Sequence, residues 1–508
     1  MTQKQLDISL TNNKIKGIKN KVLSFLGIDY AHSVQAHNRW QPSKPKTITQ
    51  EQATSFGPVA IQSSDQNAFL MAKEDLFEQN ENCLNLNIYT PDSSKKLPVM
   101  VWIHGGGFQI GSGSLASYNG ENLAQNANVV VVSINYRLGA LGFLRLCDIT
   151  NGTIPATGNE GLTDQITALK WVQQNISHFG GDKNNVTVFG ESAGAMSIAC
   201  LLASPYSKGL FHKAILQSGA AHTYSSIDKA NRVAQEFVNS ANELGFSITD
   251  LSNASMADLL SIQQHFLSRG EIYQQFGILP FTPVIDGDFL PMEPFAAIRQ
   301  GCAKNISILS GSNTDEWTLF AAMVKQNTPS NETLKAALQH LLGKPLVTPC
   351  LSIVDKQLQQ RQQHKSPQSR LSETYTEYWF AQPCHRLLHN HALAGGNAFR
   401  YKLGRRTVIK KLACTHITDI GLVFGNTSQA FHGDEPRVSE LVNQMQTCWA
   451  NFAYHGTPET EEISWPAYHP NNDFSYLFFD HQESQVTQVE PESLYFWSQI
   501  SDQQLASF

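Results

Sequence analysis

The chain has 508 residues, of which 41% are hydrophobic and 16% are charged, so it holds enough apolar material for a large buried core. The formal net charge is −6 and no run of five or more Lys or Arg residues occurs, which argues against nucleic acid or an anionic membrane surface as a partner. The longest apolar run, near residues 129–132, is too short to span a bilayer, and residues 1–17 lack the apolar stretch of a secretory signal. We therefore expect a cytoplasmic protein without a membrane anchor.

Short strand-like runs alternate with helical stretches along the chain. Leu84, Leu86 and Ile88 alternate with polar residues, which predicts a half-buried strand. Further apolar runs predict strands at residues 97–103, 129–136, 185–189, 213–217, 306–310 and 398–403. The spacing of apolar residues predicts a helix over 162–176, and a second helix is expected over 193–203.

This alternation predicts an α/β fold with a mostly parallel central sheet flanked by helices. The chain has no internal repeat and no Pro/Gly/Ser-rich linker, so residues 1–508 are expected to form a single domain. Two helix-rich polar segments, about 221–300 and 317–397, interrupt this alternation of strands and helices after the strands at 213–217 and 306–310. We interpret them as insertions that build a cap and part of a pocket wall.

The pentapeptide Gly-Glu-Ser-Ala-Gly around Ser192 lies between a predicted buried strand and a predicted helix. Flanking glycines let the chain turn sharply, which lifts the serine hydroxyl above the sheet and next to the positive end of the helix. Without that context, Gly-x-Ser-x-Gly is a common pattern, and a serine in an ordinary Gly-rich turn is the alternative interpretation. With it, Ser192 is a candidate nucleophile.

A run of three glycines, in His104-Gly105-Gly106-Gly107-Phe108, directly follows the strand at 97–103. Bare backbone N–H groups in such a loop can point at a developing oxyanion, and Gly106 and Gly107 are the candidates here. The amide of Ala193, after the nucleophile, would be the third donor. A phosphate-binding loop is the alternative, but the spacing does not fit and no Lys follows. We interpret His104 as a packed residue that braces the loop.

These motifs occur in an order that resembles the type-B carboxylesterases, a family that includes cholinesterases, animal carboxylesterases and bacterial p-nitrobenzyl-esterase-like enzymes. The resemblance covers almost the whole chain and is closest in character to the bacterial enzymes. It rests on GIDYA (27–31), FGP (56–58), ENCLNLN (81–87), HGGGF (104–108), NYRLGALGF (135–143), GNEGLTDQ (158–165), GESAG (190–194), FHKAILQSG (211–219), PVIDGDFLP (283–291) and SWP (464–466). It implies an α/β-hydrolase fold.

The resemblance also implies the remaining two members of a Ser-His-Glu triad. The family's acid is a Glu five residues after a Gly at the end of a strand, which here matches Glu316, with Asp315 as the neighbouring alternative. The family's base precedes a Val-Phe-Gly element, which matches His416. The order Ser, Glu, His agrees with that of an α/β-hydrolase. Trp317 stands where the family usually has Gly, and it is expected to crowd the site or line its wall.

Further residues match positions that the family uses to support the site. Glu191 and Ser218 match a Glu and a Ser behind the triad, which we expect to help hold His416. Two buried ion pairs of the family match Arg39 with Glu81 and Arg137 with Asp164.

Two departures from the family bear on compartment and substrate. Secreted members have a disulfide whose first Cys is replaced here by Ala60, so Cys83 has lost that partner. Cholinesterases have a Trp on the loop that binds choline, where this chain has Lys73, which would repel a quaternary ammonium. Acetylcholine is therefore not the expected substrate.

The eight cysteines are scattered without a C-x-x-C pair, which in so long a chain predicts free and mostly buried thiols. Cys384, His385, His389 and His391 are of metal-ligating types, but the Glu of H-E-x-x-H is missing. We interpret them as part of an amphipathic helix and expect no metal or other cofactor.

The sequence therefore predicts a serine carboxylesterase that hydrolyses a small to medium neutral ester through a covalent acyl-enzyme. An amide, carbamate or thioester hydrolase with the same triad is the alternative within enzymes. A non-catalytic binding protein like the neuroligins of this family is a more remote alternative, because those members lack the nucleophile that Ser192 supplies here. The sequence leaves the oligomeric state open.

Overall fold

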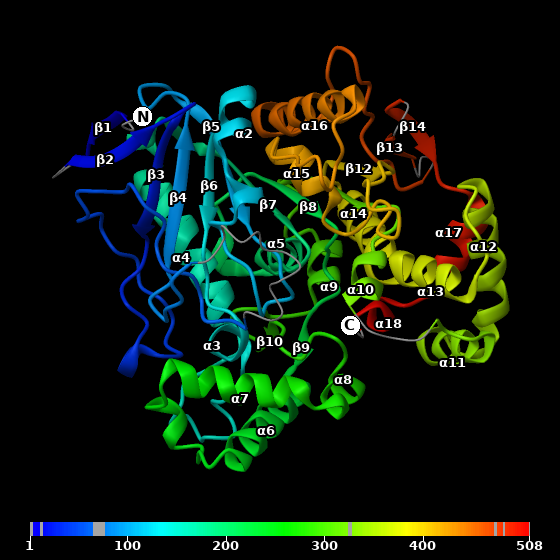
Figure 1. Ribbon diagram of the computed structural model, residues 1–508, viewed down its shortest axis with the longest axis horizontal. Helices are drawn as coiled ribbons and strands as arrows, with labels where there is room; N and C mark the ends of the chain where they lie inside the picture. The colour runs from blue at the N-terminus through cyan, green and yellow to red at the C-terminus, as the bar shows by residue number, and fades with distance from the viewer. Residues whose placement is uncertain are drawn as a thin grey trace.

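A twelve-stranded sheet runs through the molecule in the order β1-β2-β3-β4-β6-β5-β7-β8-β11-β12-β13-β14 (Figure 1). The computed structural model describes residues 4–10, 14–63, 77–323, 328–471, 475–480 and 483–506. The strands of the sheet are β1 (Lys4–Ser9), β2 (Lys14–Lys19), β3 (Leu23–Asp29), β4 (Asn85–Thr90), β5 (Leu97–Ile103), β6 (Val130–Ile134), β7 (Gly181–Glu191), β8 (Lys213–Gln217), β11 (Ser307–Asn313), β12 (Ala398–Leu403), β13 (Ser475–Phe479) and β14 (Gln485–Gln488).

The central strands β6, β5, β7, β8, β11, β12 and β13 are all parallel to one another. The strands at both edges are antiparallel, as β1 to β4 are on one side and β14 is on the other. The predicted mostly parallel sheet is therefore confirmed for the centre of the molecule. Because parallel strands end at the same edge, the loops after β5, β7, β11 and β12 meet there, where ligands bind in such sheets.

Most predicted elements appear close to their expected bounds. The helix predicted over 162–176 is α4 (Glu160–Asn175), continued by a 3-10 turn at Ile176–Phe179, and the one over 193–203 is α5 (Ala193–Ala203). The expectation of a half-buried strand around Leu84 to Ile88 was wrong, because all six residues of β4 are buried. Its polar face is satisfied internally: the Asn87 amide donates to Ser133 Oγ at 3.2 Å and accepts from the backbone N–H of Gly27 at 2.9 Å.

Helices cover both faces of the sheet. Alternate residues of β5 pack to opposite sides, with Val99 and Val101 in one apolar cluster and Met100 and Trp102 in the other. The first cluster includes residues of α4, α5 and α14 (Gln382–Leu393), and the second includes residues of α2 (Glu121–Ala127), α15 (Thr418–Phe424) and α16 (Pro436–His455). The two-sided burial explains why the central strands read as continuous apolar runs.

The helix-rich segments follow β8 and β11, as expected from the sequence. After β8 come β9 (Ser225–Ser226), α6 (Ile227–Glu243), α7 (Met256–Ser268), α8 (Gly270–Phe276), β10 (Val284–Ile285) and α9 (Pro294–Arg299). After β11 come α10 (Thr318–Met323), α11 (Asn331–Leu342), α12 (Val347–Gln360), α13 (Pro367–Thr376), a π-helical turn (Glu377–Ala381) and α14. Figure 1 shows α6 and α7 projecting below the sheet and α11 to α13 lying beyond its C-terminal edge, near α17 (Pro491–Ser498).

The smaller helices include a short α3 (Gly139–Phe143) and, at the C-terminal end, α17 followed by α18 (Asp502–Leu505). Within the described ranges, no helix combines the length and apolar character needed to cross a bilayer.

Both predicted buried ion pairs are confirmed. Arg137 Nε and Nη2 each lie 2.7 Å from an oxygen of Asp164, and both side chains are almost fully buried. Arg39 makes the same kind of bidentate contact with Glu81. Its Nε donates to Oε2 at 2.8 Å, and its Nη2 pairs with Oε1. Bidentate contacts of this kind hold the loop after β6 against α4.

Replacing Arg137 by methionine is expected to lower the free energy of unfolding by about 3–5 kcal/mol, because Asp164 would keep a buried charge without a partner. The shift is measured as a change in the urea midpoint followed by tryptophan fluorescence. The matched control is Arg370→Met, whose partner Asp355 is about a quarter exposed, as Arg370 is. That pair is expected to contribute less than about 1 kcal/mol, so equal losses in the two variants would contradict the prediction.

Candidate active site

Ser192 occupies the sharp turn between β7 and α5. Its backbone has φ of 54° and ψ of −124°, a left-handed conformation that residues other than glycine seldom adopt. Gly194 makes the turn possible, because an added Cβ there would lie 2.0 Å from the carbonyl oxygen of Ile103. The turn is anchored by the Ser192 N–H, which donates to the carbonyl oxygen of Gln217 at 2.9 Å. The predicted strand-turn-helix context of Ser192 is thus present.

Glu316 and His416 lie against each other although a hundred residues separate them. His416 Nδ1 is 2.6 Å from Glu316 Oε2, and both side chains are buried. The other carboxylate oxygen, Oε1, accepts from Ser218 Oγ and from the backbone N–H of Asn313, both at 2.6 Å. Three hydrogen bonds therefore fix the orientation of the carboxylate, which in turn fixes the imidazole ring. Of the expected pair behind the triad, Ser218 acts on Glu316 rather than directly on His416.

The neighbouring acid, Asp315, serves a different set of contacts. Its carboxylate accepts from Gln363 Nε2 at 2.9 Å and from Thr314 Oγ1 at 2.8 Å, and it lies 3.4 Å from Arg361 Nη1. Asp315 makes no hydrogen bond or ion pair with His416, so the geometry favours Glu316 as the partner of that histidine.

The second ring nitrogen of His416 points toward the residue before Ser192. Nε2 lies 3.1 Å from Glu191 Oε1, yet it is buried and has no hydrogen-bond partner among the described residues. Phe320 and Phe380 pack on the ring, with centroids 5.1 Å and 4.6 Å away. No hydrogen bond joins Nε2 to Ser192 Oγ in this structure. The imidazole is thus held from one side, with its other nitrogen free to exchange a proton.

Three carboxylates set the charge state of His416. Burial alone lowers the pKa of the imidazole, but the charges of Glu191 and Glu316 outweigh burial and raise that pKa above its usual range. Burial in turn raises the pKa of Glu191 well above that of a free carboxyl. The third acid is Asp419, which is described below.

Replacing Glu191 by glutamine is expected to shift the acid limb of the kcat/KM profile to lower pH. His416 can accept a proton only when it is neutral, and a raised pKa delays that state until the pH rises. Removing the negative charge of Glu191 lowers the pKa, so the neutral form appears earlier. The profile is measured with p-nitrophenyl butyrate from about pH 5 to about pH 10. An unmoved or alkaline-shifted limb would contradict this assignment of charge.

The Gly-rich loop after β5 lies beside the serine turn. An added Cβ on Gly105 would be 3.1 Å from the Cβ of Ser192 and 2.6 Å from Glu191 Oε2. Gly106 has φ of 109°, and a Cβ there would be 2.1 Å from the carbonyl oxygen of Ile110. The amides of Gly106 and Gly107 donate to no described residue. Ala193 is the first residue of α5, so its amide has no acceptor within the helix. Three N–H donors are therefore unused near Ser192.

His104 packs in the core, as the sequence predicted. Its ring stacks on Tyr136 with centroids 4.4 Å apart, and Nδ1 lies 2.8 Å from the carbonyl oxygen of Gly105. Burial lowers the pKa of His104 to about 4, so it is neutral and braces the loop.

Asp419 is a buried acid that sequence reasoning missed. It lies three residues after His416, near the start of α15, and accepts from Gln217 Nε2 at 2.9 Å and from Tyr401 Oη at 2.8 Å. Burial raises its pKa to about 6, and its charge adds to those that raise the pKa of His416. Only its place three residues after the predicted base marked it in the sequence, and that spacing alone does not place it, because His416 precedes the helix.

Aromatic and aliphatic side chains from the two insertions approach the site. Trp317 packs on Phe320 with centroids 5.0 Å apart and on Tyr375 at 4.6 Å. Because Phe320 contacts His416, Trp317 lies one side chain away from the catalytic candidates, and it belongs to the wall. From the first insertion, Leu279 approaches Gly107, with its Cδ2 3.1 Å from where a Cβ would stand.

The cysteines and the histidines of α14 have structural surroundings that explain their presence. All eight cysteines are free thiols and six are buried, as predicted, and Cys83 and Ala60 are both buried. His385 and His389 each lie within hydrogen-bond distance of Tyr468 Oη, at 2.9 Å and 3.2 Å. Among the described residues, no group of three or more His, Cys, Asp and Glu side chains is arranged to hold a metal. Lys73 lies outside the described residues.

A model of the carboxylesterase family matches residues 4–497 of the chain. The para-nitrobenzyl esterase of Bacillus subtilis is 36% identical over 491 residues, which span 94% of this chain and 95% of that protein. The pyrethroid hydrolase Ces2a of Mus musculus is 32% identical, with 97% of this chain and 89% of that protein covered.

Solved structures agree with the sequence comparisons. A thermophilic PNB esterase superposes with a TM-score of 0.82 at 34% identity, covering 98% of this chain and 99% of that one. A carboxylesterase of Geobacillus stearothermophilus gives a TM-score of 0.83 at 31% identity, covering 97% and 99%. The expected α/β-hydrolase fold is confirmed by this similarity. The chain therefore belongs to the carboxylesterase family and is an enzyme that hydrolyses carboxylic esters.

Proposed function

We propose that this carboxylesterase works through a Ser-His-Glu triad, in which Ser192 is the nucleophile, His416 the base and Glu316 the acid that orients the base. One observation carries the proposal. Glu316 holds His416 Nδ1 at 2.6 Å, while Nε2 is left without a hydrogen-bond partner next to Glu191, the neighbour of Ser192. A held imidazole with one free nitrogen beside a strained serine is the arrangement that nucleophilic catalysis requires.

The proposed reaction has two halves. His416 takes the proton of the Ser192 hydroxyl as the oxygen attacks the ester carbonyl, and the same His416 then protonates the departing alcohol. Water, deprotonated by His416, attacks the resulting acyl-enzyme and releases the carboxylic acid. The Glu316 carboxylate orients the imidazole and stabilises the imidazolium that forms in each half. The reaction consumes one ester and one water and needs no cofactor.

The amides of Gly106, Gly107 and Ala193 are the proposed oxyanion hole. They are unused donors close to Ser192, and the positive φ of Gly106 could not be kept by a residue with a Cβ without a clash. Donors that are fixed before the reaction stabilise the charge that develops on the carbonyl oxygen. Each one typically contributes about 10²- to 10³-fold in rate.

The proposed substrates are small to medium neutral esters. Phe320 and Phe380 contact His416, and Leu279 contacts the Gly-rich loop, so groups around the reacting carbonyl would meet mainly apolar surface. These residues come from the segments 221–300 and 317–397, which we propose to be the cap and pocket wall of a single domain. A small-molecule ester is the only partner that the site calls for.

Amide, carbamate or thioester hydrolysis with the same residues is the alternative reaction. The discriminating measurement compares kcat/KM for p-nitrophenyl butyrate with that for p-nitrobutyranilide, which has the same acyl group and releases p-nitroaniline in place of p-nitrophenol. The ester is expected to react at least about 10³-fold faster, since the anilide nitrogen must be protonated before it can leave. Equal or faster hydrolysis of the anilide would contradict the proposed preference.

The nucleophile is tested by covalent labelling. A fluorophosphonate should phosphonylate Ser192, and peptide mass spectrometry should locate the adduct within the tryptic peptide of residues 184–208. That peptide also contains Ser197, Ser204 and Ser207, which serve as internal controls for fragment assignment. Loss of ester hydrolysis in proportion to the adduct is the expected result. An adduct on another serine, or full labelling with full activity, would contradict the proposal.

We also propose that the enzyme works in a reducing compartment, the cytoplasm. Eight free thiols, six of them buried, are the supporting observation, together with Ala60 at the position where secreted relatives have a disulfide partner for Cys83.

A further inference from the structure

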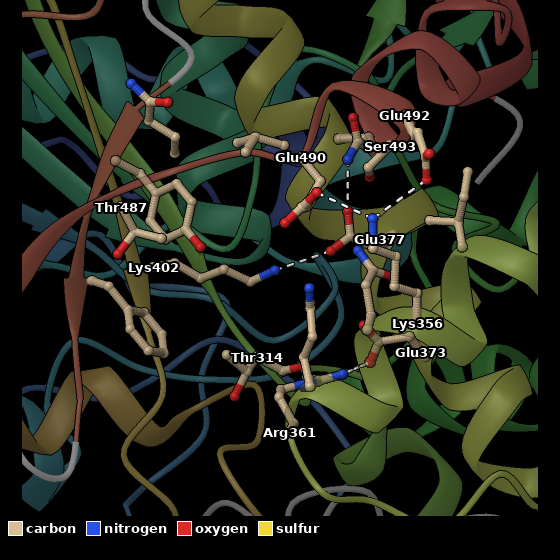
Figure 2. A pocket seen from close by; sticks show the side chains of 18 of the residues that line it. Thr314, Lys356, Arg361, Glu373, Glu377, Lys402, Thr487, Glu490, Glu492 and Ser493 are labelled. Carbon is tan, nitrogen blue, oxygen red and sulfur yellow. Dashed lines mark hydrogen bonds and ion pairs between the residues drawn. The ribbon is translucent and has the colours of Figure 1, made fainter.

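A polar cavity lies beyond the C-terminal edge of the sheet, away from Ser192. It has a volume of about 400 Å³ and is bounded by β12, β13 and β14 on one side and by α12, α13 and the π-helical turn on the other (Figure 2). None of the residues proposed for the triad or the oxyanion hole lines it. A cavity of this size accommodates a small organic molecule.

Three of the four cationic side chains that line the cavity already have carboxylate partners, as Figure 2 shows. Lys402 Nζ donates to Glu377 Oε1 at 3.0 Å, and Arg361 pairs with Glu373. The third cation, Lys356, lies within 3.4 Å of both Glu490 and Glu492. These contacts involve all four carboxylates that line the cavity.

The fourth cation, Arg400, has no such partner. It lies on the same face of β12 as Lys402, since residues two apart on a strand point the same way. Its side chain is 7% exposed, its Nη1 is buried without a hydrogen bond, and its guanidinium makes no ion pair with any described residue. The ring of Tyr476 lies beside it, with its centroid 5.5 Å from Cζ. Burial raises the pKa of Glu377, while Lys402 and, more weakly, Arg400 lower it, so this carboxylate also compensates part of the charge of Arg400 without an ion pair.

An unpaired buried guanidinium is unusual because Arg stays protonated and its charge is costly to bury without compensation. A ring face supplies part of that compensation and leaves the five N–H donors of the fork unused. The chain therefore offers, inside a cavity, a planar set of donors that matches a carboxylate in both geometry and charge.

We propose that this cavity binds a small organic monocarboxylate through a bidentate contact with Arg400. The lining holds four cations and four carboxylates, so a monocarboxylate adds one net negative charge, whereas a phosphate dianion would add two. Apolar lining from Ile353, Phe478 and Val489 suits a short alkyl chain. The class is that of the acids which ester hydrolysis releases, but binding here does not depend on which residue is the nucleophile.

Calorimetric titration with sodium butyrate tests the proposal, with ionic strength held constant by sodium chloride. The wild-type enzyme should show saturable binding, and Arg400→Met should weaken it at least about tenfold, because a charge-assisted bidentate contact is lost. The matched control is Arg370→Met, since the Arg370 guanidinium already pairs with Asp355 at 2.8 Å and 2.9 Å and does not line the cavity. It should bind butyrate as the wild type does.

Crystals soaked in 4-bromobutyrate locate the ligand by the anomalous signal of bromine. The expected density lies in the cavity, with the carboxylate on Arg400. If Arg400→Met does not fold, Arg400→Lys keeps the charge without the fork and should still weaken binding. The proposal is overturned by the absence of saturable binding in the wild type, by equal affinity in the folded Arg400 variant, or by bromine density found only beside Ser192.

Discussion

Replacing Ser192 by alanine is expected to lower kcat/KM for p-nitrophenyl butyrate by about 10⁴- to 10⁶-fold, with the fold unchanged. Without the hydroxyl no acyl-enzyme can form, so only the oxyanion hole and substrate binding would still accelerate attack by water. The left-handed backbone at this position is imposed by the strand-turn-helix geometry and does not require the hydroxyl. Stopped-flow or long-time absorbance assays cover the range of rates, and circular dichroism checks folding.

The matched control is Ser197→Ala, in the helix α5 that follows Ser192. Ser197 is also buried, and its hydroxyl accepts from Gln165 Nε2 at 3.1 Å. Its loss should cost about 1 kcal/mol of stability by removing one hydrogen bond, with kcat/KM within about threefold of the wild type. Similar activity in Ser192→Ala and the wild type would refute Ser192 as the nucleophile.

Replacing Glu316 by glutamine is expected to lower kcat by about 10³- to 10⁴-fold. The carboxylate accepts from His416 Nδ1, from Ser218 and from the amide of Asn313, and an amide group cannot accept all three bonds. The imidazole would lose the charge that stabilises its protonated form and would be free to adopt the wrong tautomer. Because substrate binding uses other groups, the loss should appear in kcat with little change in KM.

Asp315→Asn is the informative comparison, because it alters the adjacent acid in the same loop. Asp315 interacts with Arg361, Gln363 and Thr314, so the variant should lose stability while kcat falls by less than about tenfold. A larger loss of kcat in Asp315→Asn than in Glu316→Gln would reverse the assignment of the acid.

The central part of the fold could be predicted because each of its elements has a recognisable pattern within its own short segment. Strands covered on both faces appear as continuous apolar runs, and a helix with one buried side appears as a 3.6-residue spacing, so β5, β6 and α4 emerged near their observed bounds. The edge strands were not predicted from the sequence. β1 and β2 each have only two apolar residues among polar ones, and β14 is largely exposed, so their sequences give a weak burial signal and pairing with a neighbour helps to make them strands.

In the candidate site too, some parts could be predicted from local sequence patterns and others could not. The serine turn and the Gly-rich loop are short contiguous patterns that carry their own geometry, whereas Glu316 and His416 were identified through family resemblance. No local pattern brings Phe320 and Phe380 to the ring of His416, because their position depends on how the long insertion after β11 packs back onto the sheet. Asp419 was overlooked for a related reason: a single acid in a helix has no meaning until the helix is placed.

Because the proposed triad draws its three members from segments about a hundred residues apart, the order of folding has a bearing on activity. Contacts so distant in sequence close late, after the entropy of long loops has been lost. A nascent or partly refolded chain can hold its helices and the serine turn and still be inert, since the base and acid meet only when β11 and β12 have joined β8. Recovery of hydrolysis therefore reports that β11 and β12 have joined the sheet.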